Sequence, residues 1–447
     1  MSKRAFLSPL LNPLVVRLVC WLLPLGKYLF FRGLSIHIEN SDLDKLRHYR
    51  GKRMLLLPNH PTGEEPLVLF EIGQQLNEVF NFVAAREIFD FEKGFRGWVL
   101  RRVGVYSVIR GAIDRESFLM SKKILMQGKN RLITFIEGEI SGENETLIPF
   151  EPGVVQLAFW AQEALLKNTA PLKKLRYQKK NADTENILTN EAAVYIAPIA
   201  IKYFYQAGFE PVLEQSLCDL EAAVGLPVSQ KVDFYARLRA IGKTVLSIQE
   251  NLLGIVPTDS TDLTRRVERI RDEILTKLEA YLSILSDKQD TALARIRHIR
   301  NTMDQRIHTY DDPSDLPAYE QRMLDHLRQG FREFYIDLDR VVYFLTYSDT
   351  YLNENQKSAE RLIEMLRRLE REVYGQARFR YPRTAVVKVG TPTCLKSLIQ
   401  EYEANKKETS QTLCHQLEQQ MRSLLTEIHP PVSSLSPVSQ IKRNRNK

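Results

Sequence analysis

The sequence is poor in cysteine and has no cysteine pair suited to a metal or a disulfide framework. Its 447 residues hold four widely separated cysteines, Cys20, Cys218, Cys394 and Cys414. This pattern excludes a zinc ribbon and a disulfide scaffold, and it indicates a reducing compartment. Glycine and proline, 20 residues each, are too few for a collagen-like or low-complexity chain. With 44% hydrophobic residues, the chain can bury a globular core.

Long apolar runs are also missing, even from the apolar N-terminal segment. Residues 7–34 are rich in leucine, valine and aromatic residues, but prolines and basic residues interrupt them. The longest apolar run, Leu18–Leu25, is too short for a spanning helix, which needs about 20 apolar residues. No small-residue cleavage site of a signal peptide follows it. We therefore predict that residues 1–34 lie at a membrane interface, with a buried N-terminal helix hairpin as the alternative. The side chains expected near the lipid headgroups are Trp21, Tyr28, Phe30, Arg17, Lys27 and Arg32.

The chain carries a small excess of positive charge. It has 63 Lys and Arg and 55 Asp and Glu, which gives a net charge of +8. The excess is concentrated at the chain ends. Residues 1–50 carry +5 (8 basic minus 3 acidic) and residues 429–447 carry +4 (4 minus 0). The sequence has no helix-turn-helix, zinc-finger or ribonucleoprotein motif. We therefore expect no nucleic-acid partner, and we expect residues 429–447 to form a disordered basic tail.

Residues 35–205 alternate between apolar runs of strand length and segments with helical spacing. The clearest strands are expected at Met54–Leu57, Leu132–Ile136 and Val194–Tyr203, and the clearest helices at Glu64–Leu76 and Val154–Leu166. Such alternation predicts an α/β domain with helices packed on a central sheet.

The pattern between residues 206 and 383 is helical instead. Apolar residues recur there in steps of three and four, as in Phe234, Leu238, Ile241 and Val245, which is typical of amphipathic helices. Ala385–Val389 then returns to strand-forming residues, so we expect the chain to rejoin the first sheet. The predicted α/β domain is therefore 35–205 plus 384–428, interrupted by an all-helical insertion at 206–383.

One candidate for chemistry follows the strand Met54–Leu57. His60 comes just after this strand, and Glu65 lies five positions later in the first turn of a predicted helix. A carboxylate can fix one imidazole tautomer and leave the other nitrogen free to take a proton from a hydroxyl. A chance pairing on the surface is the alternative.

Three further segments lie at strand ends or within strands. Gly104–Gly111 ends a predicted strand with Arg110 beside Gly111, a pairing suited to binding phosphate. Glu137 and Gly138 directly follow the strand Leu132–Ile136, and Pro198 lies inside the strand Val194–Tyr203.

In this order, the four segments resemble the blocks of the 1-acylglycerol-3-phosphate acyltransferase family, whose first block is Asn-His, four residues, then Asp. The resemblance covers roughly residues 25–205. It implies a glycerolipid-acyltransferase-like α/β fold with a central mixed sheet flanked by helices. It also implies an O-acyltransferase that moves a fatty acyl group from acyl-CoA or acyl-carrier protein to lysophosphatidate or a related glycerolipid.

The resemblance also implies roles for individual residues. His60 would be the general base and Glu65 its orienting partner. Arg110, Gly111, Glu137 and Gly138 would bind the acceptor, and Pro198 would shape the acyl site. No cofactor and no metal are expected beyond the acyl thioester co-substrate. The expected partners are membrane lipids and acyl-carrier protein, and the expected location is peripheral or monotopic on the cytoplasmic side of a membrane.

The sequence departs from the family pattern in two blocks. Glu65 replaces the Asp of the first block, and Glu139 and Ile140 replace the Thr and Arg of the third block. Loss of that arginine leaves the acceptor headgroup open. These departures motivate a second hypothesis, a catalytically weakened lipid-binding or scaffold protein that keeps the acyltransferase fold.

Overall fold

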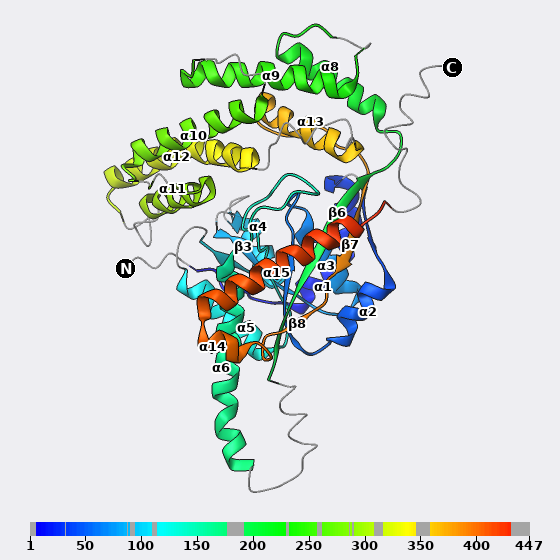
Figure 1. Ribbon diagram of the computed structural model, residues 1–447, viewed down its shortest axis with the longest axis vertical. Helices are drawn as coiled ribbons and strands as arrows, with labels where there is room; N and C mark the ends of the chain where they lie inside the picture. The colour runs from blue at the N-terminus through cyan, green and yellow to red at the C-terminus, as the bar shows by residue number, and fades with distance from the viewer. Residues whose placement is uncertain are drawn as a thin grey trace.

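In the computed structural model, a sheet domain carries a separate layer of helices along one end (Figure 1). The structure describes residues 6–31, 33–86, 88–89, 94–109, 114–176, 192–228, 232–256, 262–285, 287, 290–307, 316–345 and 358–430. Figure 1 shows the layer made by α8 to α13 lying across the end of the sheet domain. The chain enters this layer after β6 and returns from it directly into β7.

The sheet is mixed, as predicted, and its strands run in the order β1-β7-β6-β2-β5-β3-β4, with β8 beside β6. The strands are β1 Leu34–Ile38, β2 Arg53–Pro58, β3 Asn81–Ala85, β4 Val105–Val108, β5 Leu132–Ile133, β6 Val194–Tyr205, β7 Arg383–Val389 and β8 Thr393–Cys394. Strand β7 is parallel to β1 and antiparallel to β6, while the other main pairs are parallel. The strand expected near residue 385 therefore lies inside the first sheet.

Both faces of the sheet are covered because its central strand is apolar on both sides. Leu55 and Leu57 of β2 belong to one core cluster, and Met54 and Leu56 belong to the other. Alternate residues of a strand face opposite sides, so the continuous apolar run of β2 requires helices on each face. The first cluster is closed by α5 Arg115–Gln127, α6 Pro152–Arg176, α14 Ile399–Ala404 and α15 Lys406–Glu427. The second is closed by α1 Pro13–Phe31, α2 Asn40–His48, α3 Glu65–Gln75 and α4 Phe95–Arg102.

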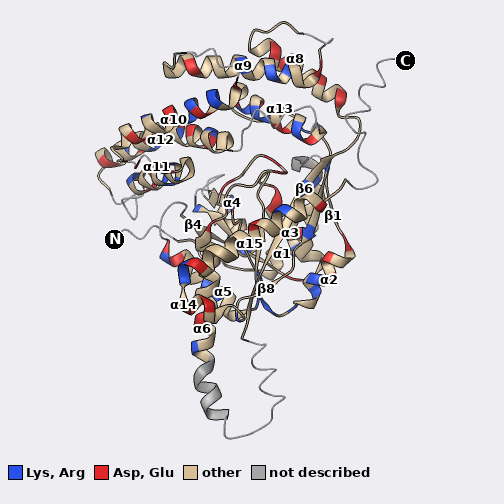
Figure 2. Ribbon diagram, in the orientation of Figure 1, with Lys and Arg blue, Asp and Glu red and all other residues tan. Residues whose placement is uncertain are grey.

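The helical layer has its own core. Its helices are α8 Glu210–Ala223, α9 Phe234–Leu253, α10 Leu263–Leu282, α11 Ala292–Ile307, α12 Ala318–Leu345 and α13 Ala359–Tyr374. The predicted stripe of Leu238, Ile241 and Val245 is buried there. Side chains cap the N-termini of α10, α11 and α13, since Asp262 accepts from Thr264 N, Thr291 from Ala294 N and Ser358 from Arg361 N. Both signs of charge are spread along this layer (Figure 2).

Strand β5 is shorter than expected. The sequence predicts a strand over Leu132–Ile136, but β5 ends at Ile133. The backbone N–H of Thr134 still bonds to Leu56 O, and a turn follows in which Gly138 N bonds to Phe135 O. Phe135 in this turn packs against the second core cluster and Ile136 belongs to the first.

Candidate active site

His60 is fixed at the carboxyl end of β2 by the residue before it. The buried Asn59 side chain donates to Ile201 O at 3.0 Å and accepts from Ile201 N at 2.8 Å. Asn59 N also donates to Ile199 O. Asn59 thus extends the pairing of β2 with β6 by one residue beyond the strand, which sets the point at which His60 leaves the sheet.

His60 and Glu65 form the pair that their spacing predicts. His60 Nδ1 lies 2.6 Å from Glu65 Oε2, and the imidazole stacks on Phe135 with the ring centroids 4.1 Å apart. Glu65 is fully buried, whereas the His60 side chain is 16% exposed. No described residue bonds to Nε2 of His60. The carboxylate therefore holds one imidazole nitrogen while the other stays open to a substrate.

Neutral groups surround the Glu65 carboxylate. Oε1 accepts from Thr62 N, Thr62 Oγ1 and Tyr203 Oη, and Oε2 also accepts from Gly63 N at 2.8 Å. Burial alone would raise the pKa of Glu65, but the bond and charge of His60 together with the hydroxyl donors lower it to about 2. Glu65 is therefore an anion at neutral pH. Tyr203 is a site residue that sequence reasoning missed, because nothing marks it within an apolar strand.

Glu137 is also fully buried at this site, but its carboxylate faces the backbone. Oε1 accepts from His60 N and Oε2 from Ile148 N, each at 2.7 Å. Burial raises the pKa of Glu137 to about 8, although these two donors oppose the shift. Glu137 therefore braces the loop against His60, and its binding of substrate remains a prediction. Gly138 is exposed at the adjacent turn with φ +72°, a conformation that favours glycine.

The remaining predicted site residues lie apart from the pair or outside the described residues. Arg110 and Gly111 fall outside the described residues. Pro198 is buried in β6 opposite Leu57, at the point where pairing of β6 with β7 gives way to β8. Its carbonyl accepts from Gly390 N at 2.9 Å. Proline has no N–H to donate to a neighbouring strand. It is tolerated here because it lies between the part of β6 that pairs with β8 and the part that pairs with β7.

The loop between β5 and α6 is attached to the helical layer by ion pairs that the sequence did not predict. Its glutamates pair with arginines of α11 and α13, and the pairs are Glu139–Arg300, Glu151–Arg297, Glu143–Arg368 and Glu145–Arg361. Ser141 N of the same loop donates to His60 O. The helical layer is thus connected to the His60 backbone through this loop.

Residues 37–202 match the family model described as Acyltransferase. The match begins in β1 and ends in β6, so it covers the strand that carries His60 and leaves out the helical layer. A direct comparison with curated proteins found no match.

Proposed function

We propose that this chain, whose residues 37–202 form a domain of the Acyltransferase family, transfers a fatty acyl group from a thioester to the hydroxyl of lysophosphatidate or a related glycerolipid. The observation that carries the proposal is the 2.6 Å contact between His60 Nδ1 and the fully buried Glu65 carboxylate. A histidine held in this way is suited to general-base chemistry.

The reaction needs no covalent enzyme intermediate. His60 Nε2 takes the proton from the acceptor hydroxyl as its oxygen attacks the thioester carbonyl carbon. The new C–O bond forms, the C–S bond breaks, and the thiolate of coenzyme A or acyl-carrier protein recovers the proton from His60. Glu65 keeps the tautomer fixed and balances the positive charge that develops on the imidazole.

Removal of His60 tests this function. We expect His60→Ala to lower the transfer of radiolabelled acyl chains from acyl-CoA or acyl-carrier protein to lysophosphatidate by about 10²- to 10⁴-fold, because it removes the base. The matched control is His415→Ala, an exposed histidine on α15, which should leave the rate unchanged. Equal rates for His60→Ala and wild type would contradict the role of His60. A wild type without transfer to any acceptor, with or without phosphate, would favour the scaffold hypothesis.

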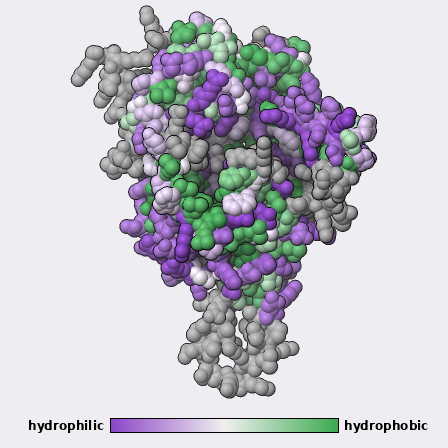
Figure 3. All heavy atoms as spheres, turned by 180° about the vertical axis from the view of Figure 1, so that it is seen from behind, coloured by the Kyte–Doolittle hydropathy of each residue, from purple (hydrophilic) through white to green (hydrophobic). Residues whose placement is uncertain are grey.

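Membrane association is part of the proposal, and the exposed face of α1 supports it. Within the described residues, no helix has the length and apolarity to cross a bilayer. One side of α1 packs on the sheet domain through Val15, Val16 and Val19. The other side exposes Leu14, Leu18, Trp21, Leu25 and Tyr28, all more than half exposed. Figure 3 shows apolar side chains on the back of the sheet domain. A helix with one packed side and one exposed apolar side, such as α1, is typical of a helix lying in the plane of a membrane interface.

Phe95 and Trp98 of α4 add to the exposed apolar residues near α1. The segment before α1 is tied to α4, since Leu10 N bonds to Arg101 O at 2.8 Å and Asn12 N to Arg102 O at 2.9 Å. All four cysteines are free thiols, which fits the cytoplasmic side of the membrane.

Charge placed on this face should prevent membrane binding. We expect the double variant Trp21→Asp and Leu25→Asp to lose most of its flotation with vesicles of phosphatidylcholine and phosphatidylglycerol, because both side chains would have to enter the interface. The control is Leu285→Asp, which changes a 96% exposed leucine of the helical layer. If the double variant floats as well as the control, the α1 face is not the membrane contact.

A further inference from the structure

Two arginines of the helical layer line a cleft beside the residues that hydrogen-bond to Glu65. The cleft is lined on one side by Pro61, Thr62 and Tyr203 and on the other by Arg367 and Arg371 of α13. Thr62 and Tyr203 both donate to Glu65. The cleft therefore begins at the donors that hold the catalytic carboxylate.

The charges around this cleft are unevenly neutralised. Arg383 pairs with Glu64, and the carboxylate of Glu364 accepts from Asn144 N. Arg367 donates to the hydroxyl of Tyr205 at 3.3 Å. The guanidinium of Arg371 lies 4.6 Å from the ring centroid of Tyr343. Within the part of the chain that the structure describes, neither Arg367 nor Arg371 contacts a carboxylate.

This sets the two arginines apart from their neighbours. Arg361 and Arg368 on the same helix pair with glutamates of the β5–α6 loop. Burial lowers the pKa of Arg371, and the positive charges of Arg367 and Arg368 lower it further. Asp339 opposes this shift at Arg371, and Glu364 also lines the cleft. Two guanidinium groups that line a cleft without an ion pair to a described carboxylate can bind an anion, and guanidinium groups bind phosphate oxygens in a bidentate manner.

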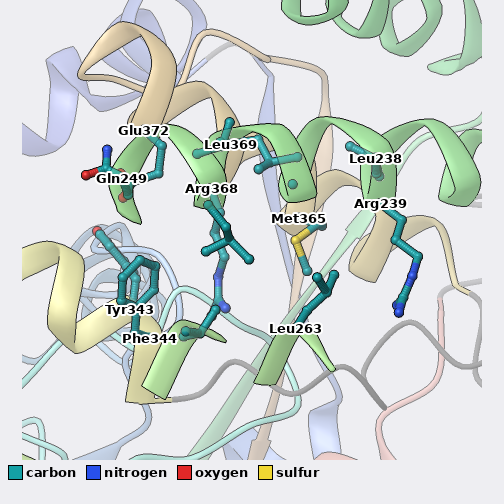
Figure 4. A pocket seen from close by; sticks show the side chains of 14 residues that line it. Leu238, Arg239, Gln249, Leu263, Tyr343, Phe344, Met365, Arg368, Leu369 and Glu372 are labelled. Carbon is teal, nitrogen blue, oxygen red and sulfur yellow. The ribbon is translucent and has the colours of Figure 1, made fainter. Parts of the chain in front are cut away.

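An apolar cavity lies on the far side of Tyr343. It has a volume of about 60 Å³, and its lining includes the apolar side chains of Leu238, Leu263, Phe344, Met365 and Leu369. Figure 4 shows these side chains around the cavity together with Tyr343 and Arg368. Tyr343 lines the cavity and also contacts Arg371, which lines the cleft. Apolar side chains of the helical layer therefore adjoin the basic cleft.

We propose that Arg367 and Arg371 form a phosphate-binding subsite through which the helical layer takes part in substrate binding. The subsite rests on the proposed function in naming its ligand, a phosphate monoester carried by a substrate. Two substrates carry such a group, the lysophosphatidate acceptor and the 3′-phosphate of coenzyme A.

The test is direct binding by the full chain, measured by calorimetry without turnover. Wild type and the double variant Arg367→Gln and Arg371→Gln are titrated with lysophosphatidate and with monoacylglycerol, which lacks the phosphate. We expect the double variant to bind lysophosphatidate about 10- to 100-fold more weakly, because charge-assisted hydrogen bonds to the phosphate are lost. Monoacylglycerol binding should stay within about twofold. Arg380→Gln, which removes an exposed arginine next to this segment, is the matched control.

Coenzyme A and dephospho-coenzyme A provide the second arm of the experiment. A loss confined to coenzyme A would support the subsite and assign it to the donor. If neither phosphate ligand binds more weakly to the double variant than to Arg380→Gln, the subsite does not exist. Should the double variant fail to fold, Arg371→Lys retains the charge without the planar fork, and unchanged binding of both phosphate ligands would overturn the role of Arg371. The calorimetric experiment measures binding and not turnover. A wild type that transfers no acyl group would contradict the proposed function, but its binding of phosphate ligands could still be compared with that of the double variant.

Discussion

Buried carboxylates at the strand ends and in the loop under the helical layer are held by different kinds of donor. Glu65, at the start of α3, accepts hydrogen bonds from the imidazole of His60, from the hydroxyls of Thr62 and Tyr203 and from backbone N–H groups. Glu139 and Glu143 lie in the loop and pair with guanidinium groups of the helical layer. Neutral donors fix a carboxylate without cancelling its charge, whereas an arginine fixes it and neutralises it.

The kind of donor distinguishes the carboxylate that we assign to the reaction from the carboxylates that attach the helical layer to the loop. In the proposed mechanism Glu65 must remain an anion to support positive charge on His60, and the hydroxyl and backbone donors around it allow that. Glu139 and Glu143 hold two parts of the chain together, and ion pairs remote in sequence suit that role. This comparison predicts that substitutions that break the ion pairs of the loop lower the free energy of unfolding, while substitutions of Glu65 lower kcat.

The largest effect is expected from breaking the Glu139–Arg300 pair, whose side chains are 8% and 3% exposed. We expect Arg300→Met to lower the free energy of unfolding by about 3–5 kcal/mol, because it leaves a buried charge without its main partner. Urea unfolding measures this loss. At temperatures well below the unfolding midpoint, kcat should stay within about threefold of wild type.

The matched control for this variant is an exposed pair. Arg422 and Glu418 pair within α15, and the arginine is 51% exposed, so Arg422→Met should cost no more than about 0.5 kcal/mol. Adding Glu139→Gln to Arg300→Met should recover part of the loss, because the buried charge is then removed as well. If Arg300→Met lowers kcat strongly without lowering stability, the loop pair belongs to the chemistry and the comparison fails.

The features that the sequence predicts well are formed by residues that lie close together along the chain. The spacing of His60 and Glu65 sufficed because a strand end and the first turn of the next helix bring residues five positions apart into contact. A central sheet with flanking helices follows from apolar runs of strand length and stripes of helical spacing, while its mixed strand directions are implied by the family resemblance. Each of these patterns is local. The predicted packing of helices on the sheet is confirmed, because helices cover β2 on both faces of the sheet.

The rest of the site depends on contacts between distant residues. Tyr203 reaches Glu65 across 138 positions, and Arg300 reaches Glu139 across 161. Such contacts follow from strand order and from the way the helical layer lies over the loop, which no local pattern encodes. Glu137 shows the same limit, since its backbone partners His60 and Ile148 become visible only once the loop is folded.

A smaller effect is expected at Glu65. We expect Glu65→Gln to lower kcat about 100-fold, or roughly 3 kcal/mol in the barrier, because the amide cannot balance charge on His60. Its NH₂ group would also face donors from Thr62, Gly63 or Tyr203. Steady-state transfer to lysophosphatidate measures the effect. Glu65→Asp keeps the charge on a shorter side chain and should lose only about tenfold; equal losses in both variants would mean that length, and not charge, sets the role of Glu65.

The pH dependence of stability tests the same charge independently of the reaction. The pKa of Glu65 is about 2 in the folded chain against an ordinary value of 4.5. A lowered pKa stabilises the folded state fully above the ordinary value, and this contribution is lost as the pH falls from 4.5 toward 2. The difference in unfolding free energy between wild type and Glu65→Gln should therefore be constant above about pH 5.5 and shrink below pH 4.5. A difference that does not change between pH 6 and pH 3 would show that His60 and the hydroxyl donors do not lower the pKa of Glu65, and the contrast with the arginine-held carboxylates would lose its basis.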